Sequence, residues 1–425
     1  MQVTIDPALI NGTVAAPASK SYTQRVLAAA LLHKGTTVIR NAGDSADEQA
    51  AKEIIQQLGA KVSFTAPGKI QVISAGVAPV SGHIHCGESG LAARLFTPIA
   101  ALSSAAVTIE GAGSLLQRPM AGFNEVLPAL GVTVTGFNGR LPVTVQGPLT
   151  PVSVSINGAD GSQFLSGLLF AICAAATTRV AVGVAELKSK PYIDLTLEVL
   201  GHFGWPVVHH DYKEFSIDPS LFTSRDTVEI DAEGDWSSAA YLLVAGAIAG
   251  NIEVANLNIN SKQADRAIID VLRDCGASIT VGADNISVAK SRMRAFEFDA
   301  TDRPDLFPVL SILAACCDGE SYIRGVHRLF HKESDRAQSI SEMLENFAFP
   351  FSMEDDCLCI TGVRKLQGTV IDGYNDHRIV MAAAIGALRA NGPVDITCAD
   401  AVKKSYPAFF TDLISCGAKC TFNQE

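Results

Sequence analysis

Apolar segments of helical length recur along the chain, and each is opened by polar residues and followed by a short strand-like segment. The polar openings lie at residues 21–25, 88–90, 161–163, 235–237, 304–306 and 375–377, and the following segments read TTVIR, AVTIE, TRVAV, NIEVA, SYIRG and PVDIT. In the third apolar segment the spacing i, i+3, i+4, i+7 is carried by Leu165, Leu168, Leu169 and Ile172, with Ala and Gly between them. Because most faces of such a helix are apolar, we expect it to be buried.

A second helix in each repeat is amphipathic and ends at a glycine. The glycines are Gly59, Gly131, Gly204, Gly276 and Gly417; the first four are 72, 73 and 72 residues apart, and Phe347 stands in the fifth position. Glycine after a helix adopts the left-handed conformation without steric cost. Near residue 270 the apolar stripe is Ile268, Val271, Leu272 and Cys275, while the side chains expected to face water are Asp265, Arg266, Asp270 and Arg273.

These patterns predict six repeats of about 71 residues that together account for the chain. Within each repeat we expect strand–helix–strand–helix–strand–strand, with an inner and an outer helix against a small sheet. The fold class is therefore α/β, with two similar domains of three repeats each. The polar stretch 226–233 is the expected link between them.

Composition narrows the class of protein. The chain has 425 residues, of which 48% are hydrophobic and 18% charged, so it is too apolar for disorder and long enough for two cores. Its net charge of −11 argues against nucleic acid or an anionic membrane as a partner. The longest apolar stretches run about 12 residues, and the N-terminus lacks a signal-peptide pattern. With ten cysteines and no C-x-x-C pair, we expect reduced thiols and a cytoplasmic location.

Basic residues stand where the outer helices are expected to begin. They are Arg118, Lys190, Lys262, Lys332 and Lys404. A cation at a helix N-terminus is unfavourable unless an anion is nearby. Ser, Asp and Pro at these places can be simple helix caps, but the repeated cations predict a positive cleft between the domains, suited to a small molecule with phosphate and carboxylate groups.

Proton-transfer groups lie among these cations, namely Asp305, Glu333 and His377. No Walker sequence, G-x-G-x-x-G or metal-ligand spacing occurs, so neither nucleotide nor metal is indicated. His83-x-His85 has the spacing of a metal pair, but we expect it to be a strand surface.

Seven ordered motifs between positions 18 and 410 resemble the family of 5-enolpyruvylshikimate-3-phosphate synthases, which are enolpyruvyl transferases. They are ASKS at 18–21, QRP at 117–119, SQ at 162–163, SKPYID at 189–194, KESDR at 332–336, NDHR at 375–378 and KSYP at 404–407. The resemblance implies two domains of three βαβαββ units, like inside-out α/β barrels, with two chain crossings. The implied ranges are 19–229, mainly for shikimate 3-phosphate, and 1–18 with 230–425, mainly for phosphoenolpyruvate and catalysis.

The implied reaction transfers the enolpyruvyl group of phosphoenolpyruvate to the 5-hydroxyl of shikimate 3-phosphate, on the route to chorismate and the aromatic amino acids. The resemblance further implies a monomer that needs no metal or organic cofactor and is a target of glyphosate. The catalytic residues implied are Asp305 as the base, and Glu333 with Lys20 for the proton at the methylene carbon.

The same resemblance assigns binding residues. Those for shikimate 3-phosphate are Lys20, Ser21, Arg25, Ser162, Gln163, Ser189, Tyr192, Asp305, Arg328 and Lys332. Those for phosphoenolpyruvate are Lys20, Gly90, Arg118, Gln163, Arg336, His377, Arg378 and Lys404. The sequence departs from the family at Glu88, where Asn is usual, at Leu91 and Gly161, and at Arg328, where some members have Asn.

Three alternatives differ in class or substrate. The related UDP-N-acetylglucosamine enolpyruvyl transferase has a cysteine-bearing loop before its Arg-Pro, whereas residues 113–119 read GSLLQRP. A non-catalytic binding protein would be expected to have lost Lys20, Asp305, Glu333 or Lys404, and all four are present. An RNA-phosphate enzyme of a distantly related fold is disfavoured by the acidic charge.

Overall fold

The computed structural model describes residues 1–136, 138–330, 332–363 and 365–423. The chain divides into two compact units, each with its own apolar core. The continuous unit is Ala18–Ala232, and the split unit is Met1–Pro17 together with the residues from Glu233 onward. The ranges expected from the sequence differ from these limits by one to three residues. The link lies at the end of the expected stretch 226–233, most of which is a strand.

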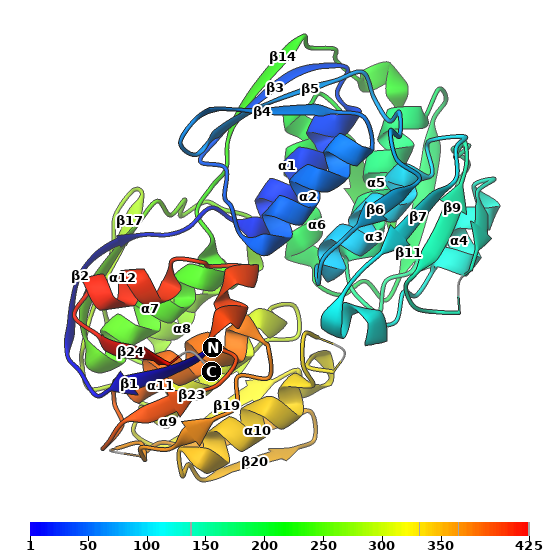
Figure 1. The fold of residues 1–425 in the computed structure, drawn as a ribbon. Coiled ribbons are helices and arrows are strands. Elements are labelled where there is room, and N and C mark those ends of the chain that lie inside the picture. The colour runs from blue at the N-terminus through cyan, green and yellow to red at the C-terminus, as the bar shows by residue number, and fades with distance from the viewer. Residues whose placement is uncertain (137, 331, 364, 424–425) are drawn as a thin grey trace. The chain divides into compact units, whose positions relative to one another are not determined.

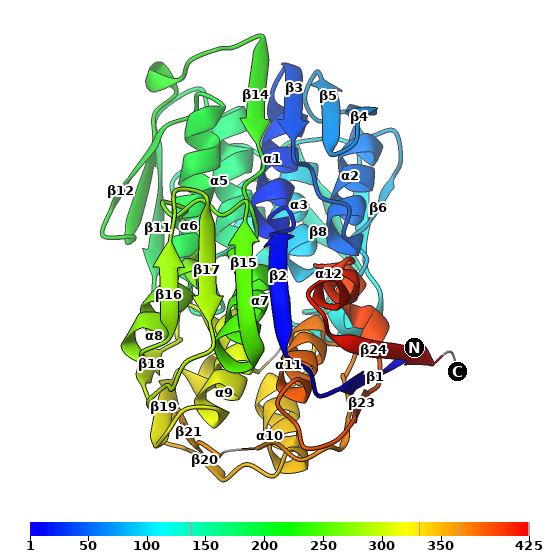
Figure 2. The same cartoon turned by 90° about the vertical axis from the view of Figure 1, so that its left-hand side faces the viewer.

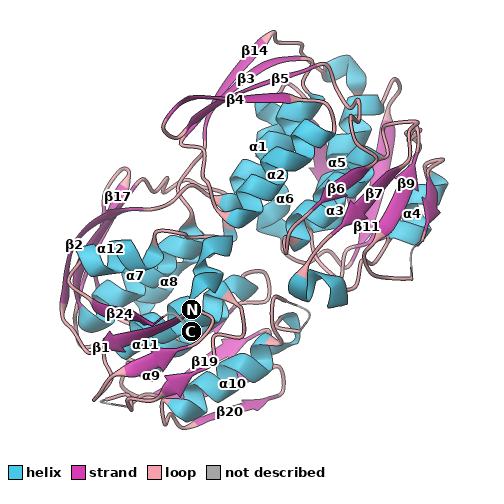
Figure 3. Cartoon of the chain, viewed as in Figure 1, coloured by secondary structure: helices cyan, strands magenta, loops and turns pink. Residues whose placement is uncertain are grey.

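The continuous unit contains three repeats in which small sheets surround a group of helices (Figures 1 and 3). The first repeat consists of β14 (Thr227–Asp231), α1 (Lys20–Leu32), β3 (Gly35–Arg40), α2 (Ala46–Gln57), β4 (Lys61–Ala66) and β5 (Lys69–Ser74). The second consists of β6 (His83–His85), α3 (Gly90–Ala100), β7 (Val107–Glu110), α4 (Phe123–Ala129), β8 (Thr133–Thr135) and β9 (Val143–Gln146). The third consists of β10 (Val154–Asn157), α5 (Gln163–Ala175), β11 (Val180–Ala185), α6 (Lys190–His202), β12 (Val207–His210) and β13 (Glu214–Ile217).

The split unit repeats this arrangement. Its first repeat consists of β2 (Ile10–Ala15), α7 (Trp236–Ala249), β15 (Gly250–Ala255), α8 (Ile268–Asp274), β16 (Ser278–Val281) and β17 (Asn285–Ala289). The second consists of β18 (Glu297–Asp299), α9 (Phe307–Ala315), β19 (Glu320–Arg324), α10 (Arg336–Asn346), β20 (Phe351–Glu354) and β21 (Cys357–Thr361). The third consists of β22 (Val370–Ile371), α11 (His377–Ala387), β23 (Val394–Ile396), α12 (Phe409–Ser415), β24 (Lys419–Asn423) and β1 (Gln2–Asp6).

Short 3₁₀ helices occupy some of the connections. They are η1 (Gly113–Gln117), η2 (Pro219–Leu221), η3 (Ala264–Ala267), η4 (Pro304–Leu306), η5 (Val326–Arg328) and η6 (Ala399–Lys404).

The described residues form six four-stranded sheets with one common strand order. In β10-β11-β13-β12 the first pair is parallel and the other two are antiparallel, and the other sheets follow the same scheme. The predicted βαβαββ repeat is therefore confirmed. Three strands come from distant parts of the chain: β2 pairs with β15, β14 pairs with β3, and β1 lies between β23 and β24. Figure 2 shows β2 at the edge of the sheet that contains β15, β16 and β17.

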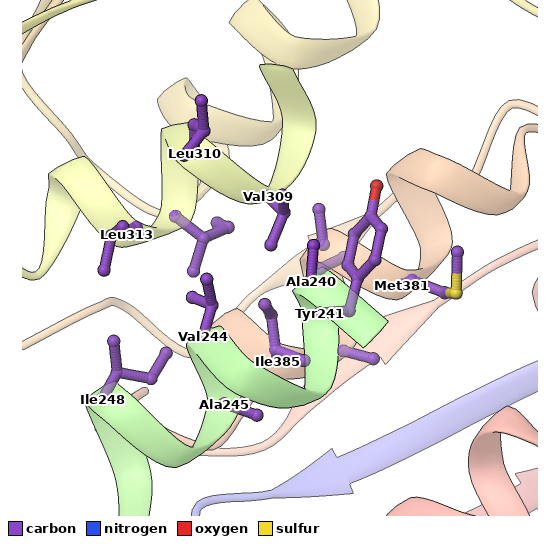
Figure 4. Packing of buried hydrophobic residues seen from close by; sticks show 14 of the residues in the cluster. Ala240, Tyr241, Val244, Ala245, Ile248, Val309, Leu310, Leu313, Met381 and Ile385 are labelled. Carbon is purple, nitrogen blue, oxygen red and sulfur yellow. The ribbon is translucent and has the colours of Figure 1, made fainter. Parts of the chain in front are cut away.

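The inner helices are buried as the apolar pattern predicted. Every residue of α7 is buried, and so are the four spaced residues of α5, Leu165, Leu168, Leu169 and Ile172. In the split unit α7, α9 and α11 pack against one another, as Figure 4 shows for Val244, Val309 and Ile385. No helix among the described residues is long and apolar enough to cross a membrane.

Five of the six described outer helices are followed by the predicted left-handed glycine, and the helix α10 is the exception. The five predicted glycines all have positive φ, between 78° and 108°. The fifth outer helix, α10, has Phe347 as its C-cap in the right-handed conformation, and the left-handed position is taken by Ala348 with φ 63°. Phe347 therefore does not occupy the glycine position. The left-handed position lies one residue later than predicted, 72 residues after Gly276, and a side chain there meets the steric cost that glycine avoids.

We expect Ala348→Gly to raise the free energy of unfolding of the split unit by about 0.5–1 kcal/mol. The left-handed conformation costs an alanine about 1–2 kcal/mol, and the greater freedom of glycine in the unfolded chain cancels part of the gain. Gly276→Ala is the matched control, because a Cβ atom there meets nothing within 4 Å and only the backbone strain remains. It should lower stability by about 1 kcal/mol. Urea denaturation checks both, and equal signs for the two variants would contradict the account.

The exposure predicted for Asp265 is also wrong, because the sequence pattern predicted that this side chain faces water. The apolar stripe of Ile268, Val271, Leu272 and Cys275 is buried, and Asp270 and Arg273 are exposed as expected. Asp265, however, is 0% exposed. It lies in η3, before α8 begins, where the helical periodicity used for the prediction does not apply.

Candidate active site

Residues predicted for the site begin the inner helices of the continuous unit. Helices α1, α3 and α5 pack against one another and start at Lys20, Gly90 and Gln163. Ser19 and Ser89 cap the first two by accepting hydrogen bonds from backbone N–H groups. Since other N–H groups of a first helical turn have no partner within the helix, such ends favour anions.

Lys20 forms an ion pair that the sequence did not indicate. Its Nζ atom lies 3.0 Å from Oδ2 of Asp47, in the first turn of α2, and the two side chains are 12% and 11% exposed. The ion pair thus lies in a place from which water is largely excluded.

Arg25 on α1 bonds Thr196 on α6 and lies near the ring of Tyr192. The guanidinium is buried; Nε donates to Oγ1 of Thr196 at 2.9 Å, and Nη1 donates to the carbonyl of Ser21 at 2.7 Å. Cζ lies 5.9 Å from the centre of the Tyr192 ring. Burial lowers the pKa of Arg25 to about 10, although Tyr192 opposes the shift. The structure therefore brings Ser21, Arg25 and Tyr192 together.

A second group in this unit joins Gly90, Arg118 and Gln163. Arg94 Nη1 donates to the Gly90 carbonyl and to Oε1 of Gln163, both at 3.1 Å, and Nη2 donates to the Pro119 carbonyl at 2.7 Å. A Cβ atom at Gly90 would lie 2.8 Å from the Arg118 guanidinium. Any side chain at position 90 would therefore displace Arg118.

Two of the departures from the family pattern border this group. Glu88 Oε2 accepts hydrogen bonds from N and Oγ of Ser114, at 3.4 and 3.5 Å, so the added carboxylate lies against η1. Gly161, with φ 124°, immediately precedes the buried Ser162, the N-cap of α5.

Ser189, another residue predicted for the site, is the buried N-cap of α6.

In the split unit an acidic residue stands at the start of each inner helix. Asp235 caps α7 by accepting from the Ser238 N–H, and Asp376 caps α11 by accepting from the Arg378 N–H. Asp305 lies in η4, directly before α9. Carboxylates suit these ends because the helix dipole is positive there.

Arg336 joins three carboxylates and is only 1% exposed. Its Nη1 donates to Asp305 at 2.6 Å, its Nη2 to Glu333 at 2.8 Å, and its Nε to Asp376 at 2.8 Å. The predicted base, the predicted proton-transfer acid and a predicted phosphoenolpyruvate ligand thus share one hydrogen-bonded cluster. We call Asp305, Glu333, Arg336, Asp376 and Arg378 the arginine–carboxylate cluster.

Arg378 completes this cluster. Its Nη2 atom lies 3.4 Å from Oδ2 of Asp305, and its buried Nε and Nη1 atoms have no hydrogen-bond partner among the described residues. Burial alone would raise the pKa of Asp305, but Arg378, Arg336 and Lys332 outweigh it and hold the pKa well below its ordinary value. Asp305 is therefore ionised, and Arg378 has donors available for an anion. His377, the next residue in the chain, is buried beside Asp376.

The remaining predicted cations lie in the same unit. Burial lowers the pKa of Lys332 to about 8, against the attraction of Asp305. Lys404 is buried and donates to the Asn375 carbonyl at 2.6 Å. Arg328 ends η5 and is half-buried.

The predicted placement of cations at helix N-termini is wrong for all but one. Only Lys190 occupies a first helical turn, that of α6. Arg118 and Lys404 lie at the C-terminal ends of η1 and η6, and Lys262 and Lys332 precede η3 and α10. Cations at C-terminal ends agree with the helix dipole, so the dipole argument gives no reason to expect an anion at Arg118 or Lys404.

Sequence reasoning missed the residues that hold the predicted ones in place. These are Asp47, Thr196 and Asp376. Asp376 was visible as a helix cap, but its contact with Arg336 depends on a distant part of the chain. His83 and His85 are exposed on β6. Among the described residues, no group of three His, Cys, Asp or Glu side chains could hold a metal ion. A cavity of about 600 Å³ is lined by Lys52, Phe64 and Lys69, among others.

Solved structures define the class of fold. The chain is similar to the EPSP synthase from Acinetobacter baumannii, with a TM-score of 0.83 and 25% identity over 99% of this chain and 100% of that one. It also resembles the enolpyruvyl transferase NikO from Streptomyces tendae, with a TM-score of 0.76; at 18% identity this likeness shows the fold alone. The fold is that of the enolpyruvyl transferases.

Sequence comparison defines the family. The pattern of the family described as EPSP synthase (3-phosphoshikimate 1-carboxyvinyltransferase) matches residues 6–413. Relatives named 3-phosphoshikimate 1-carboxyvinyltransferase include one from Clostridium novyi, 34% identical over 98% of this chain and 97% of its own length. Another, from Thermococcus kodakarensis, is 37% identical over 95% of this chain and 97% of its own length. The chain belongs to the EPSP synthase family.

Proposed function

We propose that this chain transfers the enolpyruvyl group of phosphoenolpyruvate to the 5-hydroxyl of shikimate 3-phosphate, releasing phosphate. Family membership supports the reaction. The observation that carries the assignment of residues is the arginine–carboxylate cluster, in which an ionised Asp305 lies against two buried arginines. A base next to anion-binding groups is what this reaction needs.

The proposed reaction has two steps. In the addition, a proton is delivered to the methylene carbon of phosphoenolpyruvate, the 5-oxygen of shikimate 3-phosphate attacks the neighbouring carbon, and Asp305 accepts the hydroxyl proton. In the elimination, the methyl carbon loses a proton, the double bond re-forms and the carbon–oxygen bond to phosphate breaks. We assign the proton at carbon to Glu333 and Lys20. Each such acid–base contribution is worth about 10²–10⁴-fold in rate.

Anion-binding groups are assigned by chemistry and by the family motifs. For phosphoenolpyruvate we propose Lys20, Gly90, Arg118, Gln163, Arg336, His377, Arg378 and Lys404. For shikimate 3-phosphate we propose Lys20, Ser21, Arg25, Ser162, Gln163, Ser189, Tyr192, Asp305, Arg328 and Lys332. Both sets contain residues of both units, so the proposed reaction requires both units to act on the same substrates. Charge-assisted bonds from Lys and Arg suit phosphate and carboxylate, and they stabilise the departing phosphate.

The electrostatics of Asp305 explain how a carboxylate of low pKa can act as a base. Its pKa is depressed because Arg378 and Arg336 stabilise its charge. When phosphoenolpyruvate engages these guanidinium groups, its own negative charges offset their pull on Asp305. The pKa of the carboxyl then rises, and its ability to accept a proton increases only when substrate is bound.

Phosphate release tests the proposal. We expect phosphate when shikimate 3-phosphate and phosphoenolpyruvate are both present and none with either alone, with the enol ether at the 5-oxygen identified by NMR. UDP-N-acetylglucosamine in place of shikimate 3-phosphate should give none. Turnover with the sugar nucleotide would favour the related transferase instead, and no turnover with either acceptor would contradict the proposal.

Lys20→Ala should lower kcat at least a hundredfold, because it removes both a cation for the substrates and a proposed proton-transfer group. Lys61→Ala, on the exposed surface of β4, is the matched control and should leave kcat within twofold. Near-normal turnover of Lys20→Ala would remove this residue from the mechanism.

A further inference from the structure

The buried carboxyl group of Asp265 has no role in the assignments above. Gln263 holds the preceding loop against the start of α7: its Nε2 donates to Glu233 Oε1 and to the Gly234 carbonyl, both at 2.8 Å, and its Oε1 accepts from the Trp236 N–H at 3.0 Å. This attachment turns η3 so that Asp265 points into the protein, 0% exposed.

Asp265 is only partly satisfied in this position. The Ser237 hydroxyl, in the first turn of α7, donates to Oδ2. The other oxygen, Oδ1, is buried and has no hydrogen-bond partner among the described residues. A buried carboxylate with an unpaired oxygen is costly, whereas the neutral acid is much less so.

The charged groups that act on Asp265 lie at the starts of the three inner helices of this unit. They are Asp305 before α9, Arg378 on α11 and Asp235 at the cap of α7, while Arg303 donates to the carbonyl of the adjacent Ala264. Burial, reinforced by the charge of Asp305, raises the pKa of Asp265 to about 7, and Arg378 opposes the shift. Asp265 therefore changes its charge near neutral pH, while Asp305 stays ionised.

The Arg378 side chain is only 4% exposed, and burial strengthens its interactions with other charges. Tyr241 is fully buried near Arg378, and its hydroxyl has no hydrogen-bond partner among the described residues. Figure 4 shows this hydroxyl directed away from Val244 and Ala245 in the apolar core. Interactions between charges are several-fold stronger in such a region than in water.

We propose that Asp265 is a positioning residue that acts through Arg378 and sets how strongly this arginine holds an anionic group of phosphoenolpyruvate. When Asp265 is neutral, the charge of Arg378 acts on Asp305, Asp235 and the substrate, with no competition from Asp265. When Asp265 is ionised, it competes with the substrate for the same guanidinium. The inference rests on the proposed function, because it takes phosphoenolpyruvate as the ligand of Arg378.

Asp265→Asn tests the proposal, since the amide keeps the shape, can still accept from Ser237 and never ionises. The KM for phosphoenolpyruvate is measured by phosphate release at saturating shikimate 3-phosphate from pH 6 to 8.5. We expect the ratio of wild-type to variant KM to be near one at pH 6, where Asp265 is protonated, and to rise about three- to tenfold by pH 8.5. Ionisation of the substrate cancels in this ratio. Asp270→Asn, exposed on α8, is the control and should give a ratio near one throughout.

Ser237→Ala gives a second, independent measurement. The lost hydrogen bond stabilises the ionised form of Asp265, so the rise in KM should begin at higher pH than in the wild type. A ratio for Asp265→Asn that differs from one but does not change with pH would indicate a purely structural role and overturn the inference. Absence of phosphate release by the wild type would instead contradict the proposed function.

Discussion

Asp305→Asn is expected to lower kcat for phosphate release by about 10²–10⁴-fold. Asparagine has nearly the shape of aspartate but cannot accept a proton from the 5-hydroxyl of shikimate 3-phosphate. The substitution also removes the negative charge that holds Arg336 and Arg378 at 2.6 and 3.4 Å. These arginines are then freer to bind an anion, so the KM for phosphoenolpyruvate should stay the same or fall while kcat falls. Steady-state kinetics with each substrate varied in turn separate the two effects.

The control for this variant is Asp270→Asn, which removes the same charge from an exposed position of the same unit. It should change kcat by less than twofold. A kcat of Asp305→Asn within threefold of the wild type would exclude Asp305 as the base.

Arg336→Met is expected to lower the free energy of unfolding of the split unit by about 3–5 kcal/mol. Arg336 is 1% exposed and bonds Asp305, Glu333 and Asp376. Its loss leaves the fully buried Asp376 and the largely buried Glu333 without this cation, while Asp305 keeps only the longer contact with Arg378. Arg292→Met is the matched control: Arg292 also bonds a carboxylate, Asp318 at 2.6 Å, but is 91% exposed. Exposed pairs contribute about 0–1 kcal/mol, so the control should stay within that range. Urea denaturation at pH 7 checks both.

The loss should also depend on pH with a definite sign. Asp305 has a depressed pKa in the folded wild type, so its pairing stabilises the protein above the ordinary carboxyl pKa of about 4 and is lost as the pH falls below it. The difference in stability between the wild type and Arg336→Met should therefore be largest near neutral pH and smaller in acid. A difference that is constant from pH 7 to pH 3 would mean that the variant is destabilised by packing and not by charge.

The repeat could be predicted from the sequence because its signals are local. The apolar spacing of Leu165, Leu168, Leu169 and Ile172 depends only on helical geometry, and a glycine such as Gly276 depends only on the backbone conformation after a helix. The exception at Ala348 shows the limit of the glycine signal, since an alanine can take the same conformation at a steric cost.

The site was predicted mainly through the family motifs, and the physical argument offered for it was partly wrong. Helix starts predicted from sequence put Arg118 and Lys404 at N-termini, but 3₁₀ helices precede the outer helices there. The motif residues nevertheless gather within each unit, as Arg336 and Asp305 do. The expected cleft shared by both units stays a prediction, which the loss of activity in Lys20→Ala and Asp305→Asn, one from each unit, would support.

The sequence by itself determined the order of strands and helices, the buried inner helices and the polar residues that begin them, because each depends on neighbours a few positions away. Only the tertiary structure decided which charges are buried and which partners they have. Arg25 meets Thr196 across 171 positions, Arg336 meets Asp376 across 40, and Asp265 leaves water because Gln263 binds the start of α7. Such pairings depend on distances and desolvation in the folded chain, and local periodicity carries no information about either.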